Sequence, residues 1–367
     1  MLGPHKLIVD EWSEVWDLVK PYADGSFWEW PDSFDAGAFY IVGRGLLEKH
    51  RSEILALAAQ HPGRVIFSNP AEGSYTILMQ LARHGIFEQV KNRTIGLIAS
   101  GNLEPGIDYC TIDYFANIVE YSENQHAATM SALQQKQSRP YDFLFLNGRL
   151  RPHRKYLIDE LKARGLLNRA LWSNLESRVT LGYTSALTVG DTEPIKTLPA
   201  EYEIERAVAN LNSLPTTGNV KTQLFGNTWG DAIVNHRCYS DTWFSLVTET
   251  VFDYPYSFRT EKIWKPILMG HPFIVAANRG FYRDLRNLGF HTFHSLIDES
   301  FDQIDRPNDR IEHIIQGVYR VCAFGADKFW TAAQDICRYN RERLIEYNQE
   351  NRTQFPDNLK RYLDARS

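Results

Sequence analysis

Short apolar runs alternate with helix-like segments along most of the chain. In the amino-terminal third, the runs are "HKLIVD", "GAFYIVG", "RVIFSNP" and "TIGLIAS". A continuous apolar run of about four to eight residues is typical of a strand that is buried on both faces. Strands that alternate with helices indicate parallel βαβ units. We therefore predict a Rossmann-like layer structure for this third, with a further strand at "FANIVEY".

The same alternation restarts near Tyr141. It predicts strands at "YDFLFLNG", "RALWSNL", "WFSLVTET", "HPFIVAA" and "HTFHSLI", and helices at "RPHRKYLIDELKARGLL", "TEKIWKPILMG" and "GFYRDLRNLG". Residues from about 174 to 235 lack periodicity and are predicted to be a long irregular insertion. The segments from about Asp309 onward have helical spacing.

These patterns predict an α/β protein with two Rossmann-like domains that face a cleft. The predicted boundaries are 1–137 for the first domain, 138–325 for the second and 326–367 for a helical carboxyl-terminal tail that packs back across both. In open α/β sheets, ligands bind outside the carboxyl ends of the strands. The loops that follow the strands are therefore where functional residues are expected.

Composition narrows the class of protein. With 43% hydrophobic residues and a net charge of −5, the chain is typical of a globular protein and not of one that binds nucleic acid over its whole surface. The four cysteines are scattered, which indicates reduced thiols. Acidic residues follow soon after the first apolar run at the amino terminus, which argues against a signal peptide. No apolar run reaches the length of about 18 residues that a membrane span needs. These features predict a cytoplasmic protein.

Charged residues gather where one predicted strand of the second series ends. Glu249 lies at the end of "FSLVTET", and the segment that follows contains Asp253, Tyr254, Tyr256, Arg259, Glu261 and Lys262. A helix is predicted to begin there, and the N–H groups of a helix start suit phosphate. The helix dipole disfavours Arg259 and Lys262 at this end, and a bound anion would account for them. The alternative is a solvated turn in which Glu261 pairs with Lys265.

A second charged cluster follows "YDFLFLNG". Asn147 ends this strand, and Arg149, Arg151, Arg154 and Lys155 come at the start of the next helix. The planar guanidinium of arginine suits phosphate oxygens. The alternative is a basic helix end that only contacts solvent.

Several other site types lack their motifs. No Walker A sequence and no G-x-S-x-G elbow occurs, and "GRGLLE" lacks the third glycine of a dinucleotide fingerprint. No Asp-x-Asp pair occurs either. Enzymes that hold nucleoside diphosphates through a metal commonly have one, so we expect arginine and lysine, and no metal, to neutralise phosphate here.

The stretch "FSLVTETVFDYPYSFRTEKIWKPILMGHPFIV" resembles the donor-binding segment of the α-1,3-fucosyltransferase family. Thr260-Glu261-Lys262 match the Thr-Glu-Lys of that family, and Glu249 falls at its earlier glutamate. "PHRKYLIDEL" is similar to the upstream helix of the family, with Arg154 at the phosphate-contacting arginine. The carboxyl half also resembles uncharacterised glycosyltransferase-like proteins of bacteria and phages. The chain departs from the family in having Thr248-Glu249-Thr250 in place of Phe-Glu-Asn, and the amino-terminal lobe shows no similarity.

The resemblance implies a GT-B glycosyltransferase. It implies inverting, metal-independent transfer from a nucleoside diphosphate sugar, such as a GDP- or UDP-sugar, with no other cofactor. The acceptor would be a hydroxyl group of a glycan, a metabolite or a modified DNA base. Arg154 and Lys262 would neutralise the leaving diphosphate. Glu249 and Glu261 would bind hydroxyls or balance charge on the sugar.

An inverting transfer also needs a general base, which we expect in the first domain. Glu72 in "SNPAEGSYT" is the first candidate and Glu104 in "SGNLEPG" is the second. The aromatic run "FWEWPDSF" either stacks on an acceptor ring or packs an amino-terminal hairpin. Two other functions stay open: a non-catalytic nucleotide- or glycan-binding protein of the same fold, and a Rossmann oxidoreductase.

Overall fold

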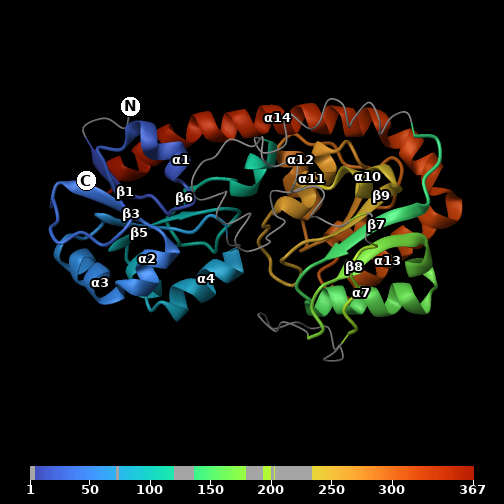
Figure 1. The fold of residues 1–367 in the computed structure, drawn as a ribbon, viewed down its shortest axis with the longest axis horizontal. Helices are drawn as coiled ribbons and strands as arrows, with labels where there is room; N and C mark the ends of the chain where they lie inside the picture. The colour runs from blue at the N-terminus through green and yellow to red at the C-terminus, as the bar shows by residue number, and fades with distance from the viewer. Residues whose placement is uncertain (1–4, 72–73, 120–135, 179–192, 200–201, 203–233) are drawn as a thin grey trace. The chain divides into compact units, whose positions relative to one another are not determined.

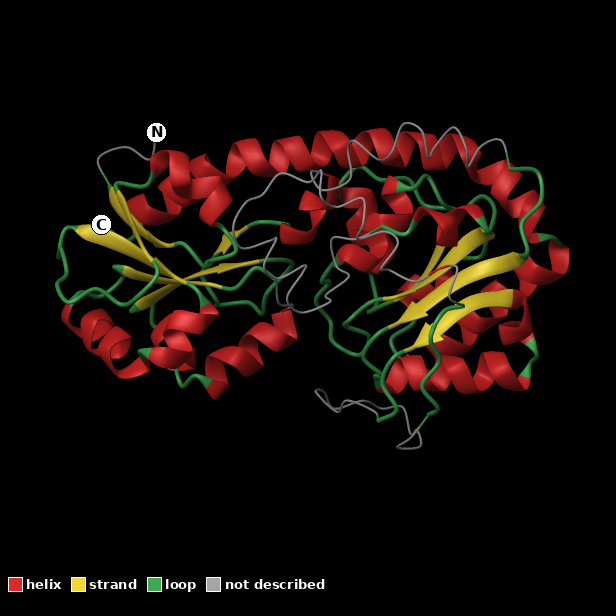
Figure 2. Ribbon diagram, in the orientation of Figure 1, coloured by secondary structure: helices red, strands yellow, loops and turns green. Residues whose placement is uncertain are grey.

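The computed structural model describes residues 5–71, 74–119, 136–178, 193–199, 202 and 234–367 (Figure 1). The fold is α/β, as predicted, with one six-stranded and one four-stranded sheet. Every pair of neighbouring strands in both sheets is parallel. Figure 2 shows helices on both sides of each sheet. The chain divides into two compact units, Met1–Phe115 with Asn348–Ser367, and Ala116–Tyr347.

The first unit is a doubly wound sheet. Its strand order is β2-β1-β3-β4-β5-β6. Because β1 lies between β2 and β3, the chain winds first to one side of β1 and then to the other. The strands are β1 (Lys6–Asp10), β2 (Gly25–Phe27), β3 (Ala38–Val42), β4 (Val65–Ser68), β5 (Ile95–Ala99) and β6 (Cys110–Thr111). Its described helices include α1 (Trp16–Val19), η1 (Lys20–Tyr22), α2 (Arg44–Lys49), α3 (Arg51–Gln60), α4 (Ser74–Arg83) and α5 (Phe87–Lys91), and η2 (Tyr114–Asn117) contains the division between the two units.

Side chains of the first sheet alternate between two hydrophobic cores. Tyr40 and Val42 face a core built with α2 to α5, whereas Phe39 and Ile41 face a core built with α1 and the end of α14 (Ala326–Asp364). A strand has a side-chain period of two, so an apolar run buried on both faces produces two cores. The aromatic run near β2 packs against the first of these cores. The predicted hairpin is wrong, since β2 pairs with β1 in parallel.

The last turns of α14 are fastened to the first sheet by Tyr362. Strand β6 pairs only with Ile98 and Ala99 of β5, so the N–H of Leu97 lies outside this ladder. The Leu97 N–H instead donates to the Tyr362 hydroxyl at 2.7 Å. Burial raises the pKa of Tyr362 to about 12, so the hydroxyl keeps its proton at neutral pH. One side chain from the carboxyl terminus therefore completes the hydrogen bonding of β5.

The second unit repeats the same winding with four strands. Its order is β10-β9-β7-β8, so β7, the first strand of this unit in the chain, lies between β8 and β9. The strands are β7 (Tyr141–Asn147), β8 (Ala170–Asn174), β9 (Thr242–Thr248) and β10 (Phe273–Ala276). The helices are α7 (Pro152–Ala163), η3 (Leu166–Arg169), α10 (His236–Ser240), α11 (Glu261–Leu268), α12 (Phe281–Asn287), η6 (Ser300–Gln303), α13 (Pro307–Phe324) and the first part of α14.

Two predicted strands are wrong and two short ones were missed. "FANIVEY" begins with the 3₁₀ turn η2 in place of a strand, and residues 120–121 lie outside the described residues. "HTFHSLI" contains a turn at residues 294–296 and no strand, and its buried Phe293 packs against Phe273 of β10 and against Phe329. The missed strands β2 and β6 have three and two residues, too few to show periodicity.

The division into units differs from the predicted boundaries. The first unit ends at Phe115 and not at 137, and the tail divides at Tyr347, so that only Asn348–Ser367 joins the first unit. Most of the predicted insertion at 174–235 lies outside the described residues. All four cysteines are buried free thiols. No helix in the described ranges is long and apolar enough to cross a membrane.

We expect Tyr362→Phe to destabilise the first unit by about 1–3 kcal/mol, because the buried Leu97 N–H would lose its acceptor. Urea unfolding and hydrogen exchange at β5 would measure this. The matched control is Tyr339→Phe, at a tyrosine of the same helix that is 40% exposed and donates to the Gly289 carbonyl. We expect the control to cost less than about 0.5 kcal/mol. Unchanged protection of β5 in Tyr362→Phe would contradict this role.

Candidate functional site

The strand order of the second unit places the predicted site residues together. The winding reverses between β7 and β9, and such a switch point is where open α/β sheets bind ligands. Asn147 ends β7 and Thr248 ends β9. The Thr248 hydroxyl donates to Asn147 Oδ1 at 2.9 Å. The two charged clusters, about a hundred residues apart in the chain, therefore start from adjacent strand ends.

Glu249 is fully buried just past β9. Its Oε1 accepts the Thr260 N–H at 3.1 Å, and its Oε2 accepts the Thr260 hydroxyl at 2.7 Å and the Thr250 N–H at 3.2 Å. Burial raises the pKa of Glu249, although the charge of Lys262 and the hydrogen bonds from Thr260 act in the opposite direction. Both carboxylate oxygens are thus committed to the two ends of the 250–260 loop.

Arg154 lies in the first turn of α7 and is only 2% exposed. Its Nη1 donates to the Arg149 carbonyl at 2.7 Å, and its Nη2 donates to the carbonyls of Thr248 at 3.0 Å and Glu249 at 3.3 Å. Burial and the neighbouring charge of Arg151 lower the pKa of Arg154 to about 10, so it stays charged at neutral pH. Arg154 therefore joins the chain after β7 to the end of β9.

Glu261 and Lys262 begin α11 and reach solvent. Their side chains are 16% and 26% exposed. Lys262 Nζ donates to Glu261 Oε1 at 2.7 Å and to the Thr260 hydroxyl at 3.1 Å. Burial acts to raise the pKa of Glu261, but the charges of Lys262 and Lys265 outweigh it and hold that pKa below its ordinary value. Thr260 caps the helix by accepting the Lys262 N–H at 3.3 Å.

The remaining predicted residues lie around this core. Arg149 is exposed after β7, Arg259 is 7% exposed beside Thr260, and the half-buried ring of Tyr256 packs edge-on against Tyr254 at 5.3 Å. Lys155 belongs to a different contact, because its Nζ pairs with Asp159 at 2.5 Å and with Glu193 at 3.0 Å.

Three residues that hold the 250–260 loop were missed by the sequence analysis. The ring of Phe252 lies between His153, stacked at 5.1 Å, and the Arg310 guanidinium, 4.5 Å from its centre. His153 Nε2 also contacts the Glu249 carbonyl at 3.0 Å, and Arg310 Nη2 donates to the Phe252 carbonyl at 2.5 Å. Burial lowers the pKa of His153 well below its ordinary value, so the ring is neutral and donates to that carbonyl. The available sequence signal was Arg310, a charged residue at a position of α13 where the helical spacing expects a buried apolar one.

Some buried polar atoms at this edge have no hydrogen-bond partner among the described residues. They are Asn147 Nδ2, Arg154 Nε and Asn278 Oδ1, from side chains that are at most 2% exposed. An unsatisfied buried polar atom costs about 1–3 kcal/mol, so native proteins rarely keep one without a use. Two of the three belong to the predicted donor site.

The first unit has a corresponding edge, where its winding reverses between β1 and β3. Asp10 ends β1, and its carboxylate accepts the Trp12 N–H and the Gly43 N–H, both at 2.9 Å. Burial raises the pKa of Asp10. A Cβ on Gly43 would lie 2.9 Å from Asp10 Oδ2, so this close approach requires glycine. Sequence analysis missed Asp10, although an acidic residue at the end of a strand was the signal.

The two predicted general bases stay predictions. Glu72 lies outside the described residues. Glu104 is exposed in the loop after β5. The edge nearest to Glu72 in the chain is the end of β4, where Ser68 Oγ and Asn69 Nδ2 are buried without a partner in the described part of the chain.

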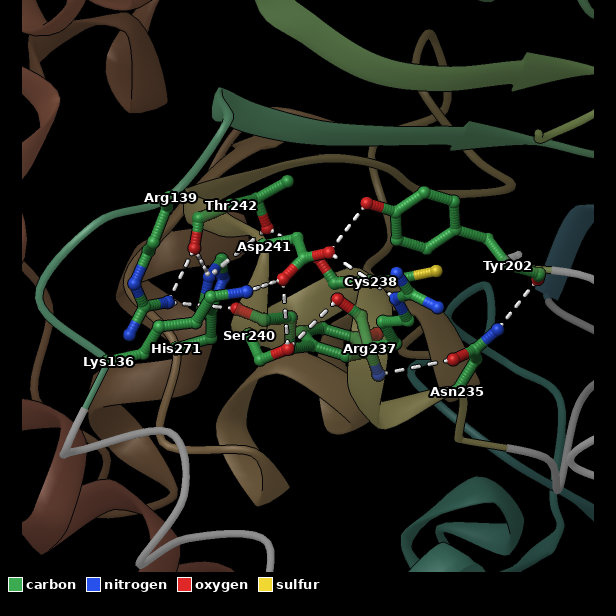
Figure 3. A network of polar contacts seen from close by, with 11 residues as sticks. Lys136, Arg139, Tyr202, Asn235, Arg237, Cys238, Ser240, Asp241, Thr242 and His271 are labelled. Atoms are coloured by element: carbon green, nitrogen blue, oxygen red, sulfur yellow. Dashed lines mark hydrogen bonds and ion pairs between the residues drawn. The ribbon is translucent and has the colours of Figure 1, made fainter. Parts of the chain in front are cut away.

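A separate polar network, with Asp241 buried in it, lies at the opposite, amino ends of β7 and β9 (Figure 3). Asp241 pairs with Lys136 and accepts the Tyr202 hydroxyl at 2.6 Å. Arg139 donates to the Thr242 carbonyl at 2.6 Å. These contacts tie the chain before β7 to the start of β9. The network is therefore interpreted as structural.

Among the described residues, no group of three or more His, Cys, Asp or Glu side chains is arranged to hold a metal ion. No protein-family model, no curated protein and no solved structure matches this chain. The site is therefore interpreted from its own geometry.

We expect Thr260→Val to destabilise the second unit by about 1–3 kcal/mol, because it removes both the helix cap and a donor to the buried Glu249. Urea unfolding would give the loss, and hydrogen exchange would show faster opening of residues 250–260. Thr260→Ser keeps the hydroxyl and is the control. Equal losses in the two variants would show that the hydroxyl does not hold the loop.

Glu249 also predicts a pH dependence. Because burial raises its pKa above the ordinary value of 4.5, the folded chain holds a proton on this carboxyl at pH values where the unfolded chain has lost it. Its contribution to stability is therefore greatest below the ordinary pKa and falls as the pH rises through the raised one. We compare the free energy of unfolding of the wild type with that of Glu249→Gln, and we expect the difference, wild type minus variant, to fall between about pH 4 and pH 8. Buried carboxyls with a raised pKa titrate in about this range. A difference that rises with pH would contradict the raised pKa.

Proposed function

We propose that the chain is a glycosyltransferase that takes its sugar from a nucleoside diphosphate sugar. One observation carries the proposal: at the switch point of the second sheet, the basic cluster after β7 lies next to the end of β9, and Glu249 holds the start of α11 to that strand end. Lys262 lies in the first turn of this helix, and two buried polar atoms of the same sheet edge, Asn147 Nδ2 and Arg154 Nε, have no partner in the described chain. The resemblance to the α-1,3-fucosyltransferase family involves the same residues.

In this proposal the diphosphate lies at the start of α11. The helix dipole and the Lys262 ammonium stabilise the negative charge that grows on the diphosphate as the bond to the sugar breaks. Lys262 is 26% exposed, and its Nζ contacts Glu261 and the Thr260 hydroxyl. A phosphate oxygen replaces one of these two partners of Nζ, and the other contact is kept. Electrostatic neutralisation of this kind needs no metal ion, in agreement with the expected metal-independent reaction.

Glu261 has a different task. The charges of Lys262 and Lys265 hold its pKa low, so its carboxylate is ionised at neutral pH and accepts hydrogen bonds from hydroxyl groups. We assign it to the ribose or the sugar of the donor. The Asn147 amide, whose Nδ2 is buried without a partner in the described chain, is a donor available to the nucleotide.

Glu249 and Arg154 act in this proposal as positioning residues. The carboxylate oxygens of Glu249 are taken up by Thr260 and Thr250, and both Nη atoms of Arg154 are taken up by backbone carbonyls. They set where α11 begins relative to β7 and β9. Arg154 also adds a positive charge close to the anion, and its Nε has no partner among the described residues.

The reaction has a second half in the first unit. An acceptor hydroxyl attacks the anomeric carbon, the bond to the diphosphate breaks, and the hydroxyl proton passes to a carboxylate base. Glu72 is the proposed base, and the acceptor is a glycan, a metabolite or a modified DNA base. The GT-B arrangement of the two units belongs to this proposal.

We expect GDP or UDP to raise the melting temperature of the full chain, since a ligand that binds only the folded state stabilises it by about 2.7 kcal/mol at 100 times its Kd. Lys262→Ala should weaken nucleotide binding about tenfold or more, the value of a charge-assisted hydrogen bond of roughly 1.5–3 kcal/mol. Lys162→Ala is the control, because Lys162 is 67% exposed on α7 and pairs with Glu193.

Other outcomes separate the alternatives. No stabilisation by GDP, UDP, CMP or their sugars would refute the donor site, as would equal binding by Lys262→Ala and the control. Nucleotide binding without hydrolysis or transfer of any sugar would favour a binding protein. Stabilisation by NAD alone would favour an oxidoreductase. Sugar release that stops when EDTA is added would refute the metal-independent mechanism.

A further inference from the structure

The second unit contains a cavity that the proposed transfer does not use. It has a volume of about 430 Å³ and lies between one face of α13, the first turns of α14 and residues 296–298. Small-molecule sites are typically concave, mostly apolar and about 300–1,000 Å³ in volume. The apolar residues of the lining are Leu296, Ile297, Gly317, Val321, Phe324, Phe329 and Ala332.

Two large apolar side chains of the lining are exposed. Phe324, at the end of α13, is 72% exposed, and Leu296 on the facing segment is 38% exposed. Large apolar side chains on opposite walls of a concave surface indicate that something apolar covers them.

Gly317 keeps the cavity open. It lies in the middle of α13, with no positive φ that would require glycine. A Cβ built on it meets no atom within 4 Å, although the residue is buried. Glycine inside a helix costs stability relative to alanine, and a larger side chain would find space here. The sequence thus carries a destabilising residue at the position where a side chain would fill the cavity.

Among the charged residues that line the cavity, Asp298, Glu312 and Arg320 have ion-pair partners, and Lys328 has none in the described part of the chain. Glu312 is held by the Arg164 guanidinium, 2.9 Å from both of its oxygens, and Asp298 accepts the Ser300 N–H at 3.0 Å and lies 3.8 Å from Arg320. Lys328 instead places its Nζ over the Phe324 ring, 5.2 Å from the centre. In the described part of the chain no carboxylate lies within ion-pairing distance of it. One cation is therefore left beside an apolar surface.

We propose that this cavity binds a small apolar molecule that carries one anionic group, such as a medium-chain alkyl carboxylate. Its chain packs against Gly317, Val321 and Phe329, and its carboxylate pairs with Lys328 at the mouth. The cavity is small within the usual range, which favours a single short chain over a larger ligand. This site is separate from the proposed donor site and does not depend on it.

Calorimetric titration of the full chain with octanoate, 1-octanol and octylammonium tests the proposal, since the three share one chain and differ in the head group. Octanoate should bind about tenfold more tightly than octylammonium. Lys328→Met should weaken octanoate binding about fivefold and leave octanol binding within about twofold. Absence of octanoate binding, or equal affinity for octanoate and octylammonium in the wild type, would overturn the proposal.

A second variant tests the place of binding. Gly317→Leu fills the cavity and should weaken octanoate and octanol binding about tenfold or more. Gly45→Leu is the matched control, because Gly45 is an exposed helical glycine of the first unit whose Cβ also meets nothing within 4 Å. If Gly317→Leu does not fold, Ala332→Leu narrows the cavity from α14 and serves in its place. If folded Gly317→Leu or Ala332→Leu bound octanoate with the same affinity as Gly45→Leu, octanoate would bind outside this cavity and the proposal would be overturned.

Discussion

Two buried charges, on Arg154 and Glu249, must each find polar partners, because an unpaired ion inside a protein costs several kcal/mol. Arg154 finds carbonyls after β7 and at the end of β9. Glu249 finds N–H and hydroxyl donors at both ends of the 250–260 loop. The dipole of α11 favours an anion such as Glu249 at its start, whereas Arg154 lies in the first turn of α7, where the dipole disfavours a cation, and is stabilised by carbonyl oxygens instead. The loop conformation and the start of α11 follow from these contacts.

At the carboxyl edge of the second sheet, the residues that hold the backbone differ from those that reach solvent. Both Nη atoms of Arg154 and both carboxylate oxygens of Glu249 bond to the 250–260 loop or to nearby backbone, whereas Glu261 and Lys262 remain partly exposed on the first turn of α11. A site that must release its ligand benefits from this separation, because the residues that bind it are held by others that stay in place. His153 and Arg310 extend the support by clamping Phe252 from two helices.

The apolar cavity on α13 and α14 shows the opposite balance. There Glu312, Asp298 and Arg320 have ion-pair partners, whereas Phe324 and Leu296 are exposed and Lys328 has no ion pair in the described part of the chain. The donor site favours a polyanion at a helix start, whereas the cavity favours an apolar body with a single charge. The second unit thus offers two surfaces of different chemistry.

Local patterns in the sequence determined the parallel strands, the helices between them and the strand ends at which charged residues gather. Apolar runs, helical spacing and helix starts depend on near neighbours, so "YDFLFLNG" and "WFSLVTET" were placed correctly as β7 and β9. Short strands such as β6, and the turns at "HTFHSLI", depend on distant partners, so the sequence did not predict them.

Only the tertiary structure decided what each charge contacts. Arg154 and Lys262 look alike in sequence, as cations at helix starts, yet one is buried against carbonyls and the other reaches solvent. The difference arises because β7 and β9 are adjacent, which brings the Thr248 and Glu249 carbonyls to Arg154 across about a hundred residues of chain. Hydrogen-bond partners at such sequence separations are set by strand order and packing, which no local pattern records.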